Sequence, residues 1–354
     1  MKNENLTIEE EFVCLKPYQQ AKVLQFLETF QEINSIDPSR EASKGMVCRK
    51  CGSGSFVKNG HYHGTARFKC KTCHSTQAKD ANTPVSMLKL KDKWVDYTFI
   101  MLDPDCPKNV GYISSQLDID TKTAFRWRHR FLSSLNSVNP LALSEETEMD
   151  EVFLPFTVKG VIGREKYKEY FGLDHPDNVE TEFRIEEKYK EEEGFQAVFL
   201  CVHNREQDFD FRPIKVHKNG SVSQDDLSGA ARGIELKDKT VITDSGASMK
   251  AFLGEIEGVN HLTFRSSDMK RGVIEDKSVH NNNINNTMML FKRWIKGFCG
   301  VSTKYIWNYL KWFRFIKLFK AFNLREIVEF TVQDKQAYPR YKDIFNDYVA
   351  LVHS

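Results

Sequence analysis

Hydrophobic and polar positions repeat along the chain with two different periods, which separate helical from extended segments. Apolar residues recur every three or four positions in four segments, the spacing of helices with one buried face. These segments are 7–34, 108–135, 284–298 and 303–323. Shorter runs that are continuously apolar or alternating predict strands. They lie at 148–161, 194–203, 209–216 and 239–244. The pattern therefore predicts a multidomain α+β protein.

Charge is unevenly distributed, although 51 Lys+Arg nearly balance 49 Asp+Glu for a net charge of +2. Segments 44–93 and 265–325 hold eleven and thirteen bases against two and three acids, whereas 145–193 holds sixteen acids and seven bases. This arrangement favours a polyanion bound on part of the surface, although solvated helix faces produce the same pattern. No apolar stretch is long enough to span a membrane, and the acidic N-terminus lacks a signal segment. We therefore expect a cytoplasmic protein without membrane contact.

Four cysteines form two CxxC pairs, Cys48/Cys51 and Cys70/Cys73, separated by eighteen residues. Each pair can direct two thiolates at one ion, and together they predict a structural four-thiolate Zn²⁺ site. Cysteines that belong to an ordinary core are the alternative. Three histidines could replace a thiolate, but four cysteines already close the shell; these are His61, His63 and His74. Basic residues surround the ligands and indicate phosphate contact, with protein docking as the alternative. They are Arg49, Lys50, Lys58, Arg67, Lys69 and Lys71.

Residues 108–135 predict helix, turn and helix, with Asp120 as the cap of the second helix. That helix is rich in basic residues: Lys122, Arg126, Arg128, His129 and Arg130. In a helix-turn-helix the second helix enters the major groove of DNA, so these side chains are candidates for contact with bases or phosphates. An ordinary amphipathic pair with Phe125 and Phe131 in its core is the alternative. The preceding basic cysteine-rich segment favours DNA.

Two acids occur in apolar strand contexts, Asp150 within MDEVF and Asp244 at the end of VITD. Rigidly held carboxylates of this kind suit divalent cations in phosphoryl transfer, although acids at strand ends also begin ordinary turns. A strand with a central acid, a hairpin, a helix and a strand ending on a second acid form a ribonuclease-H-like order. That fold takes a third ligand from a later helix. Here Asn285 and Lys292 lie seven residues apart and nearly on one helix face.

With these motifs the chain resembles the bacterial insertion-sequence transposases of the DDE superfamily, in the subgroup with an N-terminal zinc ribbon. The resemblance covers residues 45–315, including TAFRWRHRFL at 123–132 and the H280…N285…K292RW pattern. In that family the third acid is a Glu, or an Asn in some members, followed seven residues later by Lys. The resemblance implies that Asp150, Asp244 and Asn285 hold Mg²⁺ or Mn²⁺ and that Lys292 contacts phosphate. Glu275 is a rival third ligand without the lysine spacing.

The resemblance implies a DNA transposase that acts on the ends of its element and on target DNA, as a homo-oligomer on paired ends. A non-catalytic DNA-binding protein that keeps the fold and a simple metal-dependent nuclease are the alternatives. The helix at 303–323 is basic and aromatic; packing against the catalytic sheet is favoured over a membrane interface. The expected parts are a helical segment at 1–45, a zinc ribbon at 46–90, a helix-turn-helix at 91–140, a ribonuclease-H-like mixed α/β catalytic domain at 141–325 with an excursion near 162–193, and a helical tail at 326–354.

Overall fold

A computed structural model of the chain divides into two compact units, which we describe separately. Unit 1 comprises 1–100 and 320–338, and unit 2 comprises 101–319 and 339–354. The structure describes the following residues: 7–38, 45–62, 64–81, 83–102, 109–135, 141, 143–155, 195–205, 208–218, 221–244, 246–264, 279–298, 300–318 and 331–332. The expected excursion at 162–193, Glu275, His63 and nearly all of the expected tail lie outside these ranges. None of the described helices is long and apolar enough to cross a membrane.

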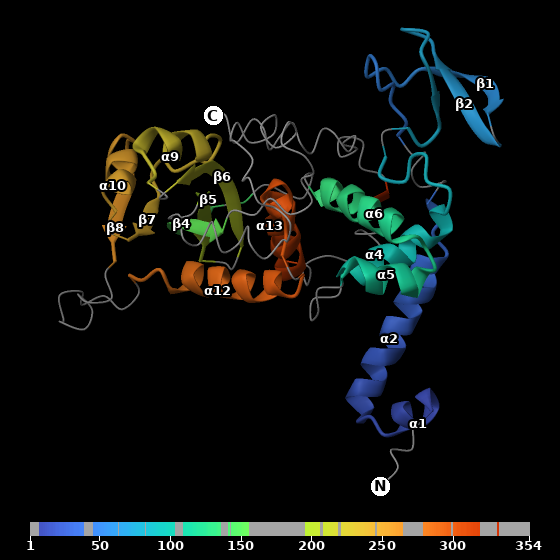
Figure 1. The fold of residues 1–354 in the computed structure, drawn as a ribbon, viewed down its shortest axis with the longest axis horizontal. Coiled ribbons are helices and arrows are strands. Elements are labelled where there is room, and N and C mark those ends of the chain that lie inside the picture. The colour runs from blue at the N-terminus through green and yellow to red at the C-terminus, as the bar shows by residue number, and fades with distance from the viewer. Residues whose placement is uncertain are drawn as a thin grey trace, which may run out of the picture. The chain divides into compact units, whose positions relative to one another are not determined.

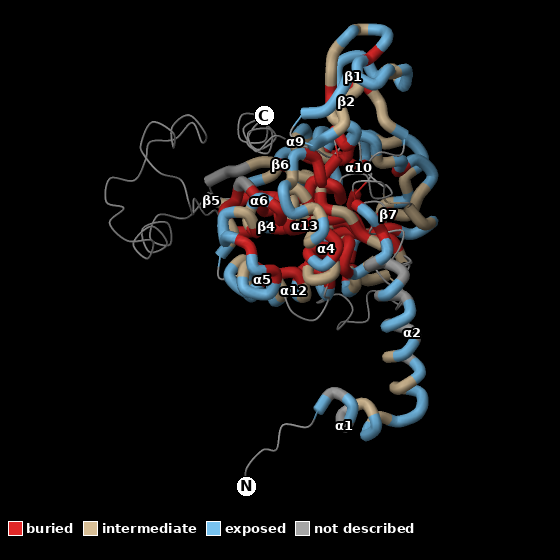
Figure 2. Tube along the Cα trace, turned by 90° about the vertical axis from the view of Figure 1, so that its right-hand side faces the viewer, coloured by how far each residue is buried: buried red, intermediate tan, exposed pale blue. Residues whose placement is uncertain are grey.

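Unit 1 begins with two helices and continues into a small sheet. Helix α1 (Ile8–Val13) precedes α2 (Pro17–Asn34), and both lie within the helical segment predicted at 7–34. Proline suits the first position of α2, because the N–H group that it lacks would have no partner inside the helix. Much of α2 is exposed (Figure 2). The sheet is antiparallel in the order β1-β2-β3, with β1 at Phe56–Tyr62, β2 at Thr65–Cys70 and β3 at Thr76–Ala78. A 3-10 turn, η1 (Lys91–Lys93), leads into α4 (Trp94–Leu102).

Two of the helices in unit 2 confirm the helices predicted within 108–135. Helix α5 (Val110–Leu117) is capped at its start by Asn109. It ends at Asp118, which adopts the left-handed backbone conformation with φ 47°. Helix α6 (Thr121–Ser134) begins after Asp120, whose side chain accepts a hydrogen bond of 2.8 Å from the backbone N–H of Lys122. The predicted cap is therefore present, because this carboxylate satisfies an N–H group that the helix leaves open.

A five-stranded mixed sheet forms the centre of unit 2, in the order β6-β5-β4-β7-β8. The strands are β4 (Glu146–Pro155), β5 (Phe195–Asn204), β6 (Phe209–Lys218), β7 (Thr240–Thr243) and β8 (Asn260–Thr263). Strands β4, β5 and β6 pair antiparallel, whereas β7 pairs parallel with both β4 and β8. Four strands confirm the predicted segments. Strand β8, with the sequence NHLT, was not predicted because it lacks an apolar run.

Helices cover both faces of this sheet (Figure 1). On one face, α9 (Gln224–Ala230) and α10 (Ala247–Gly254) pack with Met149 and Val241. On the other, α12 (Asn282–Lys296) and α13 (Thr303–Leu318) pack with Val152 and Leu154. Consecutive side chains of β4 point to opposite faces, so even-numbered residues of the strand face α12 and α13. The packed interpretation of the basic aromatic helix is confirmed, because α13 buries its apolar stripe in this core.

Candidate functional site

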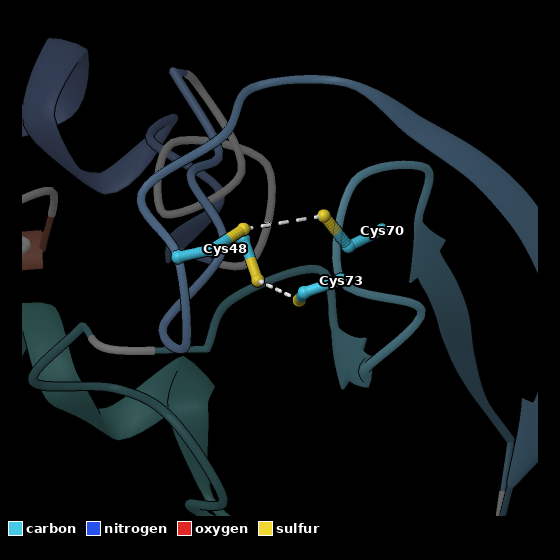
Figure 3. Close-up of side chains that lie close together, drawn as sticks. Cys48, Cys70 and Cys73 are labelled. Carbon is cyan, nitrogen blue, oxygen red and sulfur yellow. Dashed lines mark hydrogen bonds between the residues drawn. The ribbon is translucent and has the colours of Figure 1, made fainter.

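The four cysteines of the two CxxC pairs converge in unit 1. All four Sγ atoms lie within 4.8 Å of one another. Cys48 and Cys73 are 3.5 Å apart, and Cys51 and Cys70 are 3.6 Å apart, between their Sγ atoms. A tetrahedral Zn²⁺ with bonds of about 2.3 Å requires sulfur atoms about 3.8 Å apart, so the thiols are already spaced as a zinc shell. Figure 3 shows Cys48, Cys70 and Cys73 pointing toward one another.

At two of the four cysteines, local hydrogen bonds favour the thiolate form that a metal requires. The hydroxyl of Ser75, followed by backbone N–H groups of the first knuckle, lowers the pKa of Cys48 to about 6. The backbone N–H of Cys73 lowers the pKa of Cys70 in the same way. The backbone N–H of Ser53 does not compensate for burial and the neighbouring cysteines, which raise the pKa of Cys51 to about 12. The knuckles therefore stabilise negative sulfur at Cys48 and Cys70, whereas a bound metal would have to deprotonate Cys51. The basic residues proposed for DNA contact are exposed around the cluster; they are Arg49, Lys50, Lys69 and Lys71.

We expect purified protein to contain about one zinc per chain, because four thiolates complete a closed structural shell. Cys70→Ser should abolish zinc retention, measured by elemental analysis after gel filtration. Cys14→Ser is the matched control, since Cys14 is exposed and lies outside the cluster. Equal zinc content in wild type and Cys70→Ser would contradict the assignment.

The two predicted acids of unit 2 lie level with each other on adjacent strands. In the parallel pairing of β4 with β7, Glu148 is opposite Ile242. Two residues further along each strand the same register brings Asp150 beside Asp244, directly after β7. The side chain of Asp244 accepts a hydrogen bond of 2.9 Å from the backbone N–H of Gly246, which fixes the carboxylate at the start of α10. The sheet therefore holds the carboxylates of Asp150 and Asp244 next to each other.

A third carboxylate, that of Glu151, joins this pair and was missed by the sequence analysis. One oxygen from each of Asp150, Glu151 and Asp244 lies within 4.8 Å of the other two. Burial, and then the charge of Asp244, raise the pKa of Asp150 to about 7. The same two causes raise the pKa of Glu151. Two half-buried carboxylates and the exposed one of Asp244 repel one another. They are a donor set that suits a hard divalent cation, because the cation removes the repulsion.

Helix α12 supplies the other two predicted site residues, and both are exposed on it. The positive charge of Lys292 acts on Asp150 and opposes the rise in the pKa of that carboxyl. The side-chain amide of Asn285 donates a hydrogen bond of 3.1 Å to the side-chain oxygen of Asn281. Among the described residues, no hydrogen bond to the carbonyl oxygen of Asn285 is present, and this side chain is exposed.

Removing the charge of Asp150 should stabilise the metal-free protein at neutral and basic pH. The pKa of Asp150 in the folded protein lies above its value in the unfolded chain. The stability that its protonated form contributes is therefore complete below about pH 4 and is lost as the pH rises through about 7. We expect Asp150→Asn to raise the free energy of unfolding by roughly 1–3 kcal/mol at pH 8 and much less at pH 4.5.

Urea unfolding without divalent cations at the two pH values measures this difference. Glu257→Gln is the control, because Glu257 is an exposed carboxylate outside the cluster. If both variants respond alike at both pH values, the repulsion inferred at Asp150 is absent.

The basic residues of α6 divide between two environments. Lys122 and Arg126 are exposed and Arg130 is half-buried, which suits contact with DNA. Arg128 differs from the expectation, because it is 2% exposed. Its guanidinium carbon lies 5.5 Å from the ring centre of Phe298 and 5.6 Å from that of Trp312. Arg128 therefore joins α6 to the aromatic core around α13, and in this structure it presents no surface to DNA.

Comparison with known proteins links the chain to a mobile element. No protein-family model matches it. A protein described as an uncharacterized protein in the transposable element ISH50 of Halobacterium salinarum is 29% identical over 120 residues. The match covers 33% of this chain and 39% of the relative, so the chain spans well under half the length of the curated relative it matches. The similarity supports a transposase-related origin, without assigning an activity or a role to any residue.

Proposed function

We propose that the protein is the DNA transposase of an insertion sequence. It binds the terminal inverted repeats of its element and hydrolyses a phosphodiester bond at each end. The freed 3′-hydroxyl then attacks a phosphodiester of target DNA, whose own 3′-oxygen leaves. The main observation behind this proposal is that the parallel pairing of β4 with β7 holds Asp150 and Asp244 level with each other, with Glu151 beside them. The origin of the relative in a transposable element supports the same function.

The topology around these acids supports a ribonuclease-H-like catalytic domain. An acid in the central strand, an antiparallel hairpin, a helix and a parallel strand that ends on a second acid follow one another along the chain. Helix α12 then runs along the face to which Asp150 points. This is the order that the sequence predicts for the fold, with the third site residue on the later helix.

The donor set fits two Mg²⁺ or Mn²⁺ ions, which when bound would activate the attacking oxygen and stabilise the leaving one. Asp150, Asp244 and Glu151 supply negative charge, and Asn285 supplies a neutral carbonyl oxygen. The charge of Lys292 acts on Asp150, and this supports a contact between Lys292 and the phosphate next to the cleaved bond. In unit 1 the exposed bases around the cysteines, and in unit 2 those of α6, hold DNA phosphates and so orient the substrate.

Two alternative functions depend on the same geometry. The neutral side chain of Asn285 at the third position favours a DNA-binding protein that has lost catalysis. A metal-dependent nuclease would hydrolyse the bond and stop before joining. Scoring cleavage and joining separately distinguishes both from a transposase.

The direct test is incubation of the full chain with duplex DNA that carries the element's own ends, with and without Mg²⁺. We expect Asp150→Asn and Asp244→Asn to reduce cleavage at least a hundredfold, because the remaining charge no longer holds two cations. Asn285→Ala should lower cleavage sharply and leave DNA binding intact. Glu257→Gln should behave as wild type. Normal cleavage by both aspartate variants would refute the proposed site.

Replacing Arg126 should affect DNA binding and replacing Arg128 should affect stability, although the two residues are only two positions apart on α6. Exposed Arg126 contacts DNA in our proposal, so Arg126→Ala should weaken binding to the element end and lower the salt slope by about one unit. Arg128→Ala removes a buried cation between aromatic rings and should lower the free energy of unfolding by about 2 kcal/mol or more. Fluorescence anisotropy across a salt titration and urea unfolding measure the two effects. A reduced salt slope for folded Arg128→Ala alone would reverse the assignment.

A further inference from the structure

Glu148 is a buried carboxylate close to the candidate site for which the sequence suggests no role. It precedes Asp150 by two residues on the same face of β4, and its side chain is 0% exposed. Burying a charged group costs free energy unless hydrogen bonds and an opposite charge compensate it. The partners of Glu148 therefore indicate what this residue does.

The two oxygens of Glu148 bind the first turn of α12. Oε1 accepts a hydrogen bond of 2.7 Å from the side-chain amide of Asn283, and Oε2 accepts one of 2.9 Å from the backbone N–H of Ile284. The Nη1 atom of Arg205, which follows β5, lies 3.2 Å from Oε1. Nδ1 of His280 lies 3.7 Å from the same oxygen. The carboxylate thus joins β4, the end of β5 and the start of α12.

Helix α12 has no cap of its own in the usual position. Its N-cap residue, Asn281, makes no side-chain hydrogen bond to the open N–H groups of the first turn. A carboxylate at a helix N-terminus satisfies such groups and interacts favourably with the helix dipole. Glu148 therefore caps α12 from strand β4. The same hydrogen bonds connect the helix to the sheet.

We propose that Glu148 is a positioning residue, which sets the height and rotation of α12 relative to Asp150. Asp150 lies about 6.6 Å further along the strand, given a rise of about 3.3 Å per residue. Asn285 directly follows Ile284, whose N–H is held, and Lys292 lies about two turns later on the same face. One anchor thus keeps both α12 residues in register with the carboxylates. The importance of this register for catalysis rests on the proposed function.

The strand offers a matched control in Glu146. It also lies next to Arg205, with its Oε2 3.3 Å from Nε of that residue, but its side chain is 47% exposed. None of its hydrogen bonds or ion pairs that the structure describes joins it to α12. Glu146→Gln and Glu148→Gln therefore remove the same charge beside the same arginine, and only the second weakens the anchor.

Hydrogen exchange on the full chain tests the anchor without reference to activity. In Glu148→Gln the amides of the first turn of α12 should exchange at least tenfold faster, with α13 unchanged and Glu146→Gln like wild type. Asn283→Ala, which removes one of the two contacts, should give a smaller change in the same direction. It also supplies the test if Glu148→Gln does not fold. Unchanged exchange in the first turn of the folded variants would overturn the proposal.

A double-mutant cycle on cleavage tests positioning against a merely structural role. At saturating DNA and Mg²⁺, Glu148→Gln should lower the cleavage rate at least tenfold, while its affinity for the element end stays unchanged. In a Lys292→Ala background the same change should cost less than it does in wild type, because Lys292 is one of the two groups that Glu148 places. Fully additive losses would overturn the positioning role. If wild type itself does not cleave, the proposed function fails, and exchange alone decides whether Glu148 anchors α12.

Discussion

The parallel pairing of β4 with β7 is the constraint on which the candidate catalytic site depends. Parallel neighbours cannot be joined by a tight turn, so the chain passes through a hairpin and a helix before it returns beside β4. That return brings Asp244 level with Asp150, two residues beyond the pairing of Glu148 with Ile242. A shift of one residue in this register would turn the acid of β4 toward the opposite face. The hydrophobic cores on both faces hold the register that the chemistry requires.

The same register creates an electrostatic cost. Asp150 and Glu151 are half-buried beside Asp244, and burial together with its charge raises the pKa of both carboxyls. Carboxylates selected only for stability would not be gathered in this way, because repulsion between them opposes folding above the pH at which they ionise. Clustered and perturbed carboxyls are typical of functional sites, although ion-pair networks also perturb pKa values. The relative from a transposable element favours the functional interpretation.

Sequence reasoning succeeded where chemistry depends on residues close together in the chain. The doubled CxxC spacing predicted the four-cysteine cluster, the cap at Asp120 predicted the start of α6, and apolar runs predicted four of the five strands of unit 2. Sequence reasoning was less successful where the role of a residue depends on partners far away in the sequence. Glu148 belongs to the acidic stretch around 145–193, and only the fold shows that it lies against α12. Likewise Arg128 looked like its basic neighbours, because nothing in α6 indicates that Phe298 and Trp312 cover it.

Arg128 also explains how a basic helix can be both a DNA-contact candidate and part of a core. The buried side of α6 carries Arg128 and His129, and the ring of His129 lies 4.2 Å from that of Tyr305 on α13. Aromatic groups just after α12 and on α13 therefore contact the buried side of α6, whereas the bases Lys122 and Arg126 are exposed. Because α13 contacts both α6 and α12, it links the helix proposed to hold DNA phosphates to the helix that carries Asn285 and Lys292. A rigid connection of this kind reduces the orientational freedom that binding must remove before reaction.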